Sequence, residues 1–357
     1  MVIVFGTRPE IIKVAPVINA FKARGIDIGL VHTGQHYTYE MDSLIQTDLH
    51  LPPPSHNLQI GSGSHAVETS KALVGLETLY AKIQPSLVLV QGDTNSTLAG
   101  ALAAAKMQIP VGHIEAGLRS FQRQMPEEVN RVLTDHISEI LFAPTKNSLK
   151  NLISEGIPQD RALVTGNTIV DSLNVSLHSL DRGEKPQIPE LSDDFLLLTL
   201  HREENVDTKE VLSSLIEGVA SSAEYLGTQV LFPAHPRTVK RIKQFGISIP
   251  SKFMMLPPLG YLNFLRLERE ANLVFTDSGG VQEEACVLGV PCVTLRNATE
   301  RPETLEVGAN ILAGPRPKDI LHAATVMMKN GKEWDNPFGS GKAGEVIVDA
   351  IIQAKWA

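Results

Sequence analysis

Short apolar runs alternate with segments of helical periodicity along nearly the whole chain of 357 residues. Runs such as residues 87–90 and 273–275 are entirely apolar, which is typical of strands buried on both faces. The segments between the runs are long enough for crossover helices, and strand–helix–strand succession produces parallel sheets. We therefore predict an α/β fold with doubly wound parallel sheets.

The periodicity predicts the same arrangement in both halves of the chain. In the first half we expect strands at 2–5, 28–32, 87–90, 111–113, 141–143 and 163–165, with helices at 11–24, 66–83, 97–107, 127–138 and 146–155. In the second half we expect strands at 195–200, 229–232, 253–256, 273–275 and 292–295, with helices at 208–225, 238–245, 261–270 and 281–288.

A polar, proline-containing segment at residues 181–192 has no period and is the expected linker. The length fits two domains, which we place at 1–168 and 169–340. The segment 341–357 holds a last helix near 343–355, expected to pack back on the first domain. Two facing domains of this kind leave a cleft at the carboxyl ends of their strands.

Charge and hydropathy exclude several kinds of partner. The net charge of −8, from 32 basic and 40 acidic residues, argues against a nucleic-acid surface. No apolar run approaches the roughly 18 residues of a membrane span, and the first residues lack the basic start of a signal peptide. Cys286 and Cys292 read as small core residues in a reducing compartment. We expect a cytoplasmic protein.

A strand, a glycine turn and a helix follow one another at residues 273–288. The first amides of a helix lack internal partners and favour an anion, and Gly279 and Gly280 let a phosphate approach the backbone. Glu284, one turn into the helix, is placed to accept hydrogen bonds from a ribose diol. The alternative is an ordinary connection between a strand and a helix.

Polar groups also follow the other strands, where ligands of open α/β sheets gather. Asp93 alone reads equally as a helix cap, and Glu127 lies in a first helical turn, where acids are favoured anyway. Carboxyl groups beside apolar walls are nevertheless candidates for proton transfer. The groups that follow strands include Arg8, Lys13, Asp93, Glu115 and Glu127 in the first half, and His201, Arg202, His235 and Arg301 in the second.

Several familiar motifs are missing from the sequence. It has neither a Gly-x-Gly-x-x-Gly after the first strand nor a P-loop, which disfavours a nicotinamide dehydrogenase and a P-loop NTPase. A Gly-x-Ser-x-Gly elbow is also missing. His32, His36 and His113 lack metal-ligand spacing, so we expect no metal.

Nine short stretches, in this order and spacing, carry a specific resemblance. They are 6–10 (GTRPE), 33–36 (TGQH), 91–94 (QGDT), 113–119 (HIEAGLR), 126–131 (PEEVNR), 165–168 (TGNT), 201–205 (HREEN), 277–284 (DSGGVQEE) and 299–303 (TERPE). Through them the chain resembles the non-hydrolysing UDP-N-acetylglucosamine 2-epimerases along nearly its entire length. The resemblance implies two Rossmann-like domains facing a cleft, as in the GT-B architecture.

The resemblance also implies roles for residues. In the second domain the amides of Ser278, Gly279 and Gly280 would bind the diphosphate of UDP, and Glu284 the ribose. The uracil would lie near Leu259 and Phe264, and Arg8, Lys13, His201 and Arg301 match positions that contact the phosphates or the sugar. Asp93, Glu115 and Glu127 match the acid/base carboxylates; we add His201 as a catalytic candidate, and Arg202 and His235 as substrate-binding candidates.

The implied reaction interconverts UDP-GlcNAc and UDP-ManNAc. UDP is eliminated to leave 2-acetamidoglucal and adds back with inversion at C2, without a metal or redox cofactor. A homodimer serving polysaccharide biosynthesis is the family expectation. Three alternatives stay open: a retaining glycosyltransferase, a hydrolysing epimerase and a non-catalytic nucleotide-sugar sensor. Bacterial members also bind substrate at an allosteric site; Gln35 and His36 are present here, but residues 61–65 depart from the bacterial pattern.

Overall fold

The computed structural model of the protein describes residues 1–34, 49, 51–181, 194–331 and 333–354. The chain forms two compact units. The first contains Met1–His178 together with Phe338–Ala357, and the second contains Ser179–Pro337.

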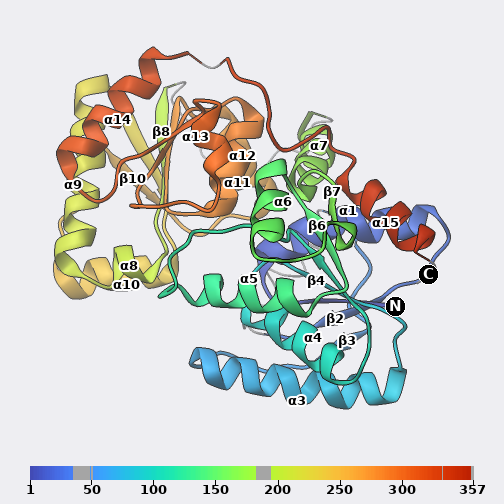
Figure 1. The fold of residues 1–357 in the computed structure, drawn as a ribbon. Coiled ribbons are helices and arrows are strands. Elements are labelled where there is room, and N and C mark those ends of the chain that lie inside the picture. Colours follow the sequence, from blue (N-terminus) through green and yellow to red (C-terminus); the bar gives the residue numbers. More distant parts are fainter. Residues whose placement is uncertain (35–48, 50, 182–193, 332, 355–357) are drawn as a thin grey trace. The chain divides into compact units, whose positions relative to one another are not determined.

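The described part of the first unit is built on a seven-stranded parallel sheet in the order β3-β2-β1-β4-β5-β6-β7 (Figure 1). Its strands are β1 (Val2–Phe5), β2 (Gly29–His32), β3 (His56–Asn57), β4 (Val88–Gln91), β5 (Val111–Ile114), β6 (Ile140–Ala143) and β7 (Ala162–Val164). Its helices are α1 (Arg8–Ala23), α3 (His65–Ile83), α4 (Asn95–Lys106), α5 (Pro126–Ile137), α6 (Lys146–Ser154), α7 (Thr168–Asp181) and α15 (Ala343–Gln353), with a 3₁₀ turn at Gln159–Arg161.

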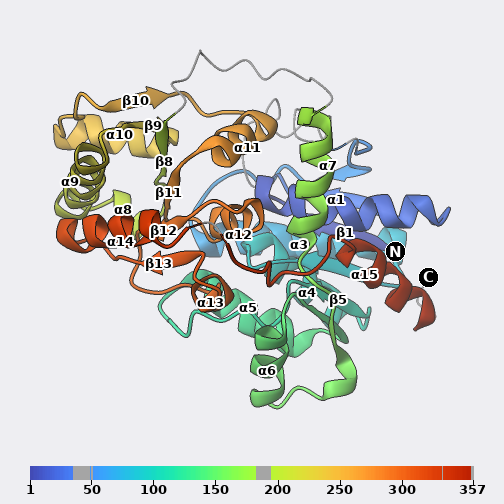
Figure 2. The same ribbon diagram turned by 90° about the horizontal axis from the view of Figure 1, so that it is seen from above.

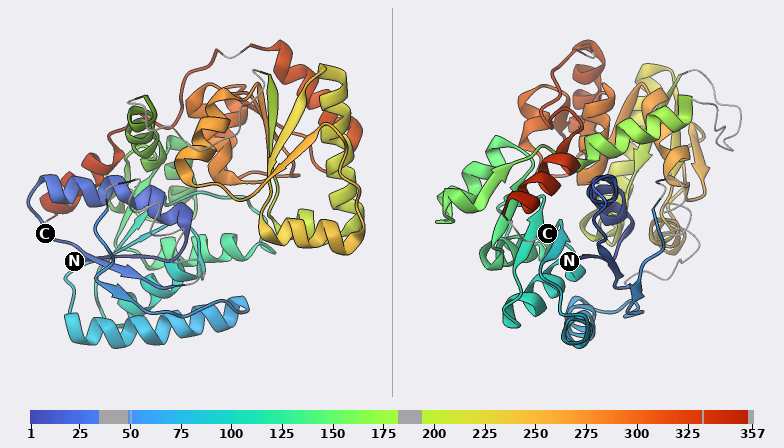
Figure 3. Two further views of the ribbon diagram at one scale, coloured as in Figure 1. Left: turned by 180° about the vertical axis from the view of Figure 1, so that it is seen from behind. Right: turned by 90° about the vertical axis from the view of Figure 1, so that its right-hand side faces the viewer.

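Helices cover both faces of this sheet. Val4 and Val90, paired through β1 and β4, belong to a core cluster with Leu76 of α3 and the alanines of α4. Figure 3 shows α1 and α15 together on the opposite side of the sheet from α3. Because both faces are buried, the strands carry the unbroken apolar runs seen in the sequence.

The second unit repeats the plan with a six-stranded parallel sheet in the order β10-β9-β8-β11-β12-β13 among the described residues. Its strands are β8 (Phe195–Thr199), β9 (Gln229–Pro233), β10 (Phe253–Leu256), β11 (Leu273–Thr276), β12 (Cys292–Thr294) and β13 (Asn310–Leu312). Its helices are α8 (Glu203–Val206), α9 (Lys209–Leu226), α10 (Pro236–Phe245), α11 (Tyr261–Glu270), α12 (Gly279–Leu288), α13 (Pro302–Glu306) and α14 (Pro317–Lys329).

The alternating residues of β8 show how this sheet is covered. Leu196 and Leu198 pack in one cluster with residues of α9 and α14, whereas Phe195 and Leu197 pack in another with residues of α11 and α12. Figure 2 shows α11 and α12 as neighbours within this unit. The predicted fold class, two Rossmann-like α/β domains, is confirmed.

The structure adds elements that were not predicted, and both predicted boundaries of the second domain differ from those of the second unit, which is Ser179–Pro337. β3, β13, α7, α8, α13, α14 and the 3₁₀ turn were not predicted. Residues 169–178, expected in the second domain, belong to α7 and pack with the first unit, where Ser172 Oγ donates to Ile12 O at 2.6 Å. Residues 182–192 of the expected linker lie outside the described residues.

The last helix, α15, contacts α1. A Cβ on Gly344 would lie 2.7 Å from the backbone of Pro16, and Arg24 forms an ion pair with Asp349 at 2.6 Å. The described helices include none with the length and apolarity needed to cross a membrane.

Candidate active site

The residues predicted to bind an anion lie at the junction of β11 and α12, and the predicted helix start is wrong by two residues. The helix begins at Gly279, with Ser278 as its N-cap, so the two glycines are its first residues and not part of a preceding turn. Ser278 Oγ accepts a hydrogen bond from Val281 N at 3.5 Å. The other first-turn amides have no partner within the helix, which is the arrangement that binds anions.

The two glycines at this helix start have different surroundings. A Cβ on Gly279 would lie 2.5 Å from Glu300 Oε1, so only glycine allows this carboxylate to approach. A Cβ on Gly280 would meet nothing closer than Ser278 Oγ at 3.9 Å. Gly279 is therefore required by the protein's own packing, and Gly280 leaves open space beside the backbone.

Asp277, just before α12, forms hydrogen bonds with the segment that follows β8. Its carboxylate is fully buried and accepts hydrogen bonds from the backbone N–H groups of His201 and Arg202, each at 3.0 Å, and from Asn205 at 3.1 Å. His201 Nδ1 lies 2.8 Å away. Burial alone would raise the pKa of Asp277, but the neighbouring His201 and the donated hydrogen bonds lower it to about 2.

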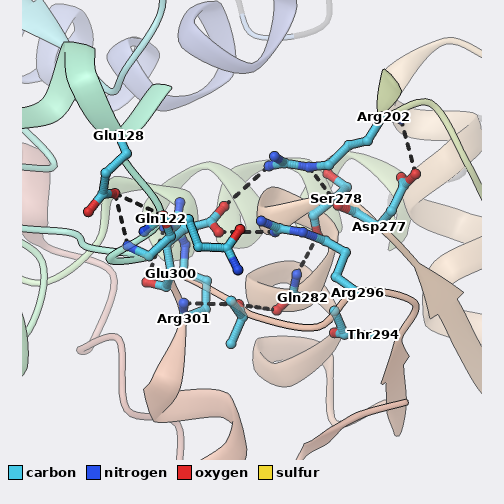
Figure 4. A network of polar contacts seen from close by, with 12 residues as sticks. Gln122, Glu128, Arg202, Asp277, Ser278, Gln282, Thr294, Arg296, Glu300 and Arg301 are labelled. Atoms are coloured by element: carbon cyan, nitrogen blue, oxygen red, sulfur yellow. Dashed lines mark hydrogen bonds and ion pairs between the residues drawn. The ribbon is translucent and has the colours of Figure 1, made fainter. Parts of the chain in front are cut away.

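Arginines surround a single carboxylate next to this helix start (Figure 4). Glu300 forms ion pairs with Arg296 at 3.0 Å and with Arg202 at 3.4 Å, and Arg202 Nε donates to Asp277 O at 2.9 Å. Arg301 is buried and paired with Glu283. Cations therefore lie beside the α12 start. From the sequence we selected Arg202 and Arg301 as site candidates but not Asp277, Arg296 and Glu300, although all three also follow strands.

The candidates for contacting the base and the ribose lie just before α11, on α11 and on α12. Glu284 is buried and accepts a hydrogen bond from the Tyr261 hydroxyl at 3.3 Å. Leu259 and Phe264 are partly buried and pack against the cluster that contains residues of α11 and α12. His235 is exposed, and its Nδ1 accepts the N–H of Arg237 at 3.3 Å, so the ring caps α10.

In the first unit, Asp93 lies between β4 and α4 and is held by a buried arginine. Arg131 donates to Asp93 Oδ2 through Nη2 at 2.6 Å and through Nε at 3.0 Å, and Asn130 donates to Asp93 O at 2.9 Å. The side chain of Asp93 is 28% exposed, so the carboxylate stays accessible. Thr94, not Asp93, is the N-cap of α4. Helix capping therefore does not explain why a carboxylate is found at position 93.

Glu115 follows β5 and is buried between two donors. Lys13 of α1 forms an ion pair with Glu115 Oε1, and the amide of Gln91 donates to Oε2. The backbone of Glu115 has φ of 71°, in the left-handed region that non-glycine residues rarely adopt and that is enriched at functional sites. Arg8, the first residue of α1, is half-buried.

The two adjacent glutamates of α5 differ in their surroundings. Glu128 is buried and accepts from Ser120 N and Phe121 N, each at 2.9 Å, and from Arg131 at 2.7 Å. The predicted Glu127 is half-buried on a different face of the helix. Glu128 is thus a structural partner of Arg131, whereas Glu127 is the more exposed of the two glutamates.

The described histidines considered as metal ligands have other partners. His113 is fully buried, with Nδ1 2.7 Å from Asp135 Oδ1 and Nε2 2.8 Å from Gly92 O. Burial would raise the pKa of Asp135, but His113 and Arg119 lower it. His32 Nδ1 accepts from Gly34 N at 2.9 Å. His36, like Gln35, lies outside the described residues.

One Rossmann-like unit has cations beside a helix start, a type of position that often binds phosphate in α/β proteins, and the other has carboxylates held by cations. The family model for UDP-N-acetylglucosamine 2-epimerase matches residues 19–352. The chain belongs to this family, whose members are isomerases.

Named relatives match along almost the full length. The UDP-N-acetylglucosamine 2-epimerase of Methanocaldococcus jannaschii is 49% identical, over 99% of both chains. Its crystal structure in complex with UDP-GlcNAc and UDP has a TM-score of 0.95, with 50% identity and 99% coverage of both chains. A UDP-2,3-diacetamido-2,3-dideoxy-D-glucuronate 2-epimerase of Pseudomonas aeruginosa is 39% identical over 98% of both chains.

Proposed function

We propose that the chain is a non-hydrolysing epimerase that interconverts UDP-GlcNAc and UDP-ManNAc. Family membership and the M. jannaschii complex with UDP-GlcNAc and UDP support the nucleotide sugar. The observation that carries the catalytic part is the pair of carboxylates, Asp93 and Glu115. Each follows a central strand of one sheet and is bound by a cation of the same unit.

The second unit would hold the leaving group. Ser278, Gly279 and Gly280 would donate backbone amides to the diphosphate, beside Arg301 and Arg202. The uracil would lie at Leu259 and Phe264, and Glu284 would accept the ribose hydroxyls. Positive charge and a helix start stabilise the charge that develops on UDP as the C1–O bond breaks.

The first unit would carry the proton chemistry. A carboxylate takes the proton from C2 while UDP leaves C1, which gives 2-acetamidoglucal. UDP then adds back to C1 as a proton is delivered to the opposite face of C2. Asp93, Glu115 and Glu127 are the proposed acid/base groups, with His201 as a further catalytic residue, and Arg8 and Lys13 bind substrate. A positioned acid or base typically contributes about a hundredfold or more to such a step.

We further propose that His235 contacts the substrate while its Nδ1 caps α10. We also propose that the enzyme is a cytoplasmic homodimer that supplies polysaccharide biosynthesis. The family relationship supports these points. Size-exclusion chromatography with light scattering tests the dimer.

The deciding experiment incubates the protein with UDP-GlcNAc in deuterated water and follows the products by NMR. We expect UDP-ManNAc with deuterium at C2 and no steady release of free UDP. Steady release of UDP with free ManNAc would indicate a hydrolysing enzyme, and absence of UDP-ManNAc without an acceptor would favour a glycosyltransferase. Asp93→Asn should keep UDP affinity and lose turnover; unchanged turnover would refute the catalytic assignment. A parallel incubation with the diacetamido-glucuronate nucleotide tests which sugar is preferred.

A further inference from the structure

Glu10, in the first turn of α1, joins two turns of the first unit. Its side chain is buried, and Oε2 accepts hydrogen bonds from Gly6 N at 3.0 Å, Thr7 N at 2.8 Å and the Thr7 hydroxyl at 2.8 Å. Oε1 lies 2.9 Å from the Thr94 hydroxyl and 3.2 Å from the Thr97 hydroxyl. One carboxyl group therefore connects the turn after β1 with the turn after β4.

Both turns lead directly to the carboxylates of the proposed site. Thr94 follows Asp93 in the chain, so a bond to its hydroxyl restrains the Asp93 backbone. Thr97 Oγ1 lies 2.7 Å from Gln91 O, and the Gln91 side chain donates to Glu115. The residues around Glu10 thus reach Asp93 on one side and Glu115 on the other.

We propose that Glu10 is a positioning residue for Asp93 and Glu115: it fixes residues 91–97 against the start of α1 and so holds both carboxylates in place. The proposal rests on the function proposed above, because it assigns Glu10 a part in the same reaction. Glu10 is not proposed to touch the substrate, since its side chain is 2% exposed and both oxygens are occupied by protein donors.

The hydrogen-bond pattern suits a carboxyl group in its neutral form. Thr97 has one hydroxyl proton, which the 2.7 Å contact directs to Gln91 O. The remaining contact between Thr97 Oγ1 and Glu10 Oε1 is then satisfied if Glu10 carries a proton and donates it. Burial raises the pKa of Glu10 to about 7, against the hydrogen bonds from Thr7, Gly6, Thr94 and Thr97.

Charged groups on the surrounding elements engage other partners. Lys13 of α1 binds Glu115, and Asp93, before α4, binds Arg131. The described contacts of Glu10 are backbone amides and hydroxyl groups. An uncharged amide should therefore replace this carboxyl group, with its oxygen toward Gly6 and Thr7 and its NH₂ toward the hydroxyls across the turn.

The test compares Glu10→Ala with Glu10→Gln. We expect Glu10→Ala to lower kcat for epimerisation about tenfold or more, because a small misplacement of a catalytic group costs that much. UDP affinity, measured by titration calorimetry, should stay within about twofold, since most of the proposed nucleotide contacts belong to the second unit and only Arg8 and Lys13 to the first. Glu10→Gln should keep kcat within about threefold of the natural chain.

A second measurement does not depend on turnover. Amide hydrogen exchange of residues 91–97 should become faster in Glu10→Ala and stay unchanged in Glu10→Gln. If Glu10→Ala does not fold, Thr97→Val replaces by a methyl group the hydroxyl that contacts Glu10, Gln91 O and Thr94 N, and it should also speed exchange at residues 91–97. The matched control is Asp171→Ala: Asp171 also accepts two backbone N–H groups in this unit, at 2.9 and 3.2 Å, but none from a proposed site residue. It should lower stability and leave kcat unchanged.

Three results would overturn the proposal. Normal kcat in Glu10→Ala would show that the site does not need the hydrogen bonds of Glu10. Equal loss in Glu10→Gln and Glu10→Ala would show that the negative charge, not the hydrogen-bond geometry, matters. Unchanged exchange at 91–97 in Glu10→Ala would show that Glu10 does not hold the turn. If the natural chain itself fails to epimerise UDP-GlcNAc, the proposed function is refuted. The exchange comparison still tests whether Glu10 holds residues 91–97 in place.

Discussion

Replacing Asp277 by asparagine should destabilise the second unit by an amount that the structure sets. The carboxylate is fully buried, accepts hydrogen bonds from His201, Arg202 and Asn205, and has its pKa lowered from 3.8 to about 2. At about 1.4 kcal/mol for each pH unit, the ionised form is stabilised by about 2.5 kcal/mol relative to the unfolded chain. The asparagine NH₂ group cannot accept the backbone N–H groups, which adds to the loss.

The pH dependence follows from the direction of this change. Because the pKa is lower in the folded protein, the stabilisation is fully present above the ordinary value of 3.8 and is lost as the pH falls toward 2. Asparagine does not titrate. The difference in unfolding free energy between the two proteins should therefore be constant from pH 7 to pH 5, at about 2.5 kcal/mol or more, and narrow below about pH 4.

Urea unfolding followed by tryptophan fluorescence measures this difference. Trp334 Nε1 donates to Cys286 O at 2.8 Å in the second unit, and a Trp356→Phe background leaves Trp334 as the chain's single tryptophan. With a urea dependence of about 2 kcal/mol per molar, the midpoint at pH 7 should fall by about 1 M. Asp319→Asn, at a surface ion pair of α14, should change the free energy by less than about 0.5 kcal/mol. A change below about 1 kcal/mol in Asp277→Asn, or one independent of pH, would refute the reasoning.

Three further substitutions test other parts of the site. Arg131→Met leaves the buried Glu128 without its cation and should lower the free energy of unfolding by about 3–5 kcal/mol. Adding Glu128→Gln to this variant should recover part of the lost stability. Equal stability of the single and double variants would contradict this explanation. Gly279→Ala should weaken UDP binding about tenfold by calorimetry, because its Cβ displaces the neighbouring carboxylate, whereas Gly280→Ala should change it less than about threefold. Glu127→Gln should lower kcat about a hundredfold with an unchanged melting temperature; a stability loss without a rate effect would make it structural.

The sheet strands were largely predictable because their burial on both faces leaves unbroken apolar runs. β1 and β10 have the predicted bounds, and each of the other predicted strands differs from the observed strand by one residue at one or both ends. β3 and β13 are too short to leave a clear pattern. α7 was not predicted although its sequence is amphipathic. We placed the domain boundary after residue 168 and the linker at 181–192, and assigned no helix between them.

Sequence located the polar groups of the site but not their pairing. Residues that follow parallel strands can be found from the strand pattern, and this gave Asp93, Glu115 and His201. Which of Glu127 and Glu128 points into the protein depends on the phase and packing of α5, which the sequence does not fix. The start of α12 at Gly279 likewise depends on Ser278 serving as the cap and on the carboxylate that packs beside the glycine.

The contact between α1 and α15 determines which of the two units can finish folding first during protein synthesis. The first unit combines residues 1–178 with α15, so the face that α15 covers cannot be completed until that helix has left the ribosome. Residues 179–337 are available earlier, and domains generally fold as units during translation. The second unit is therefore the first that can finish folding, and the half of the enzyme whose strands are synthesised first is the last to be completed.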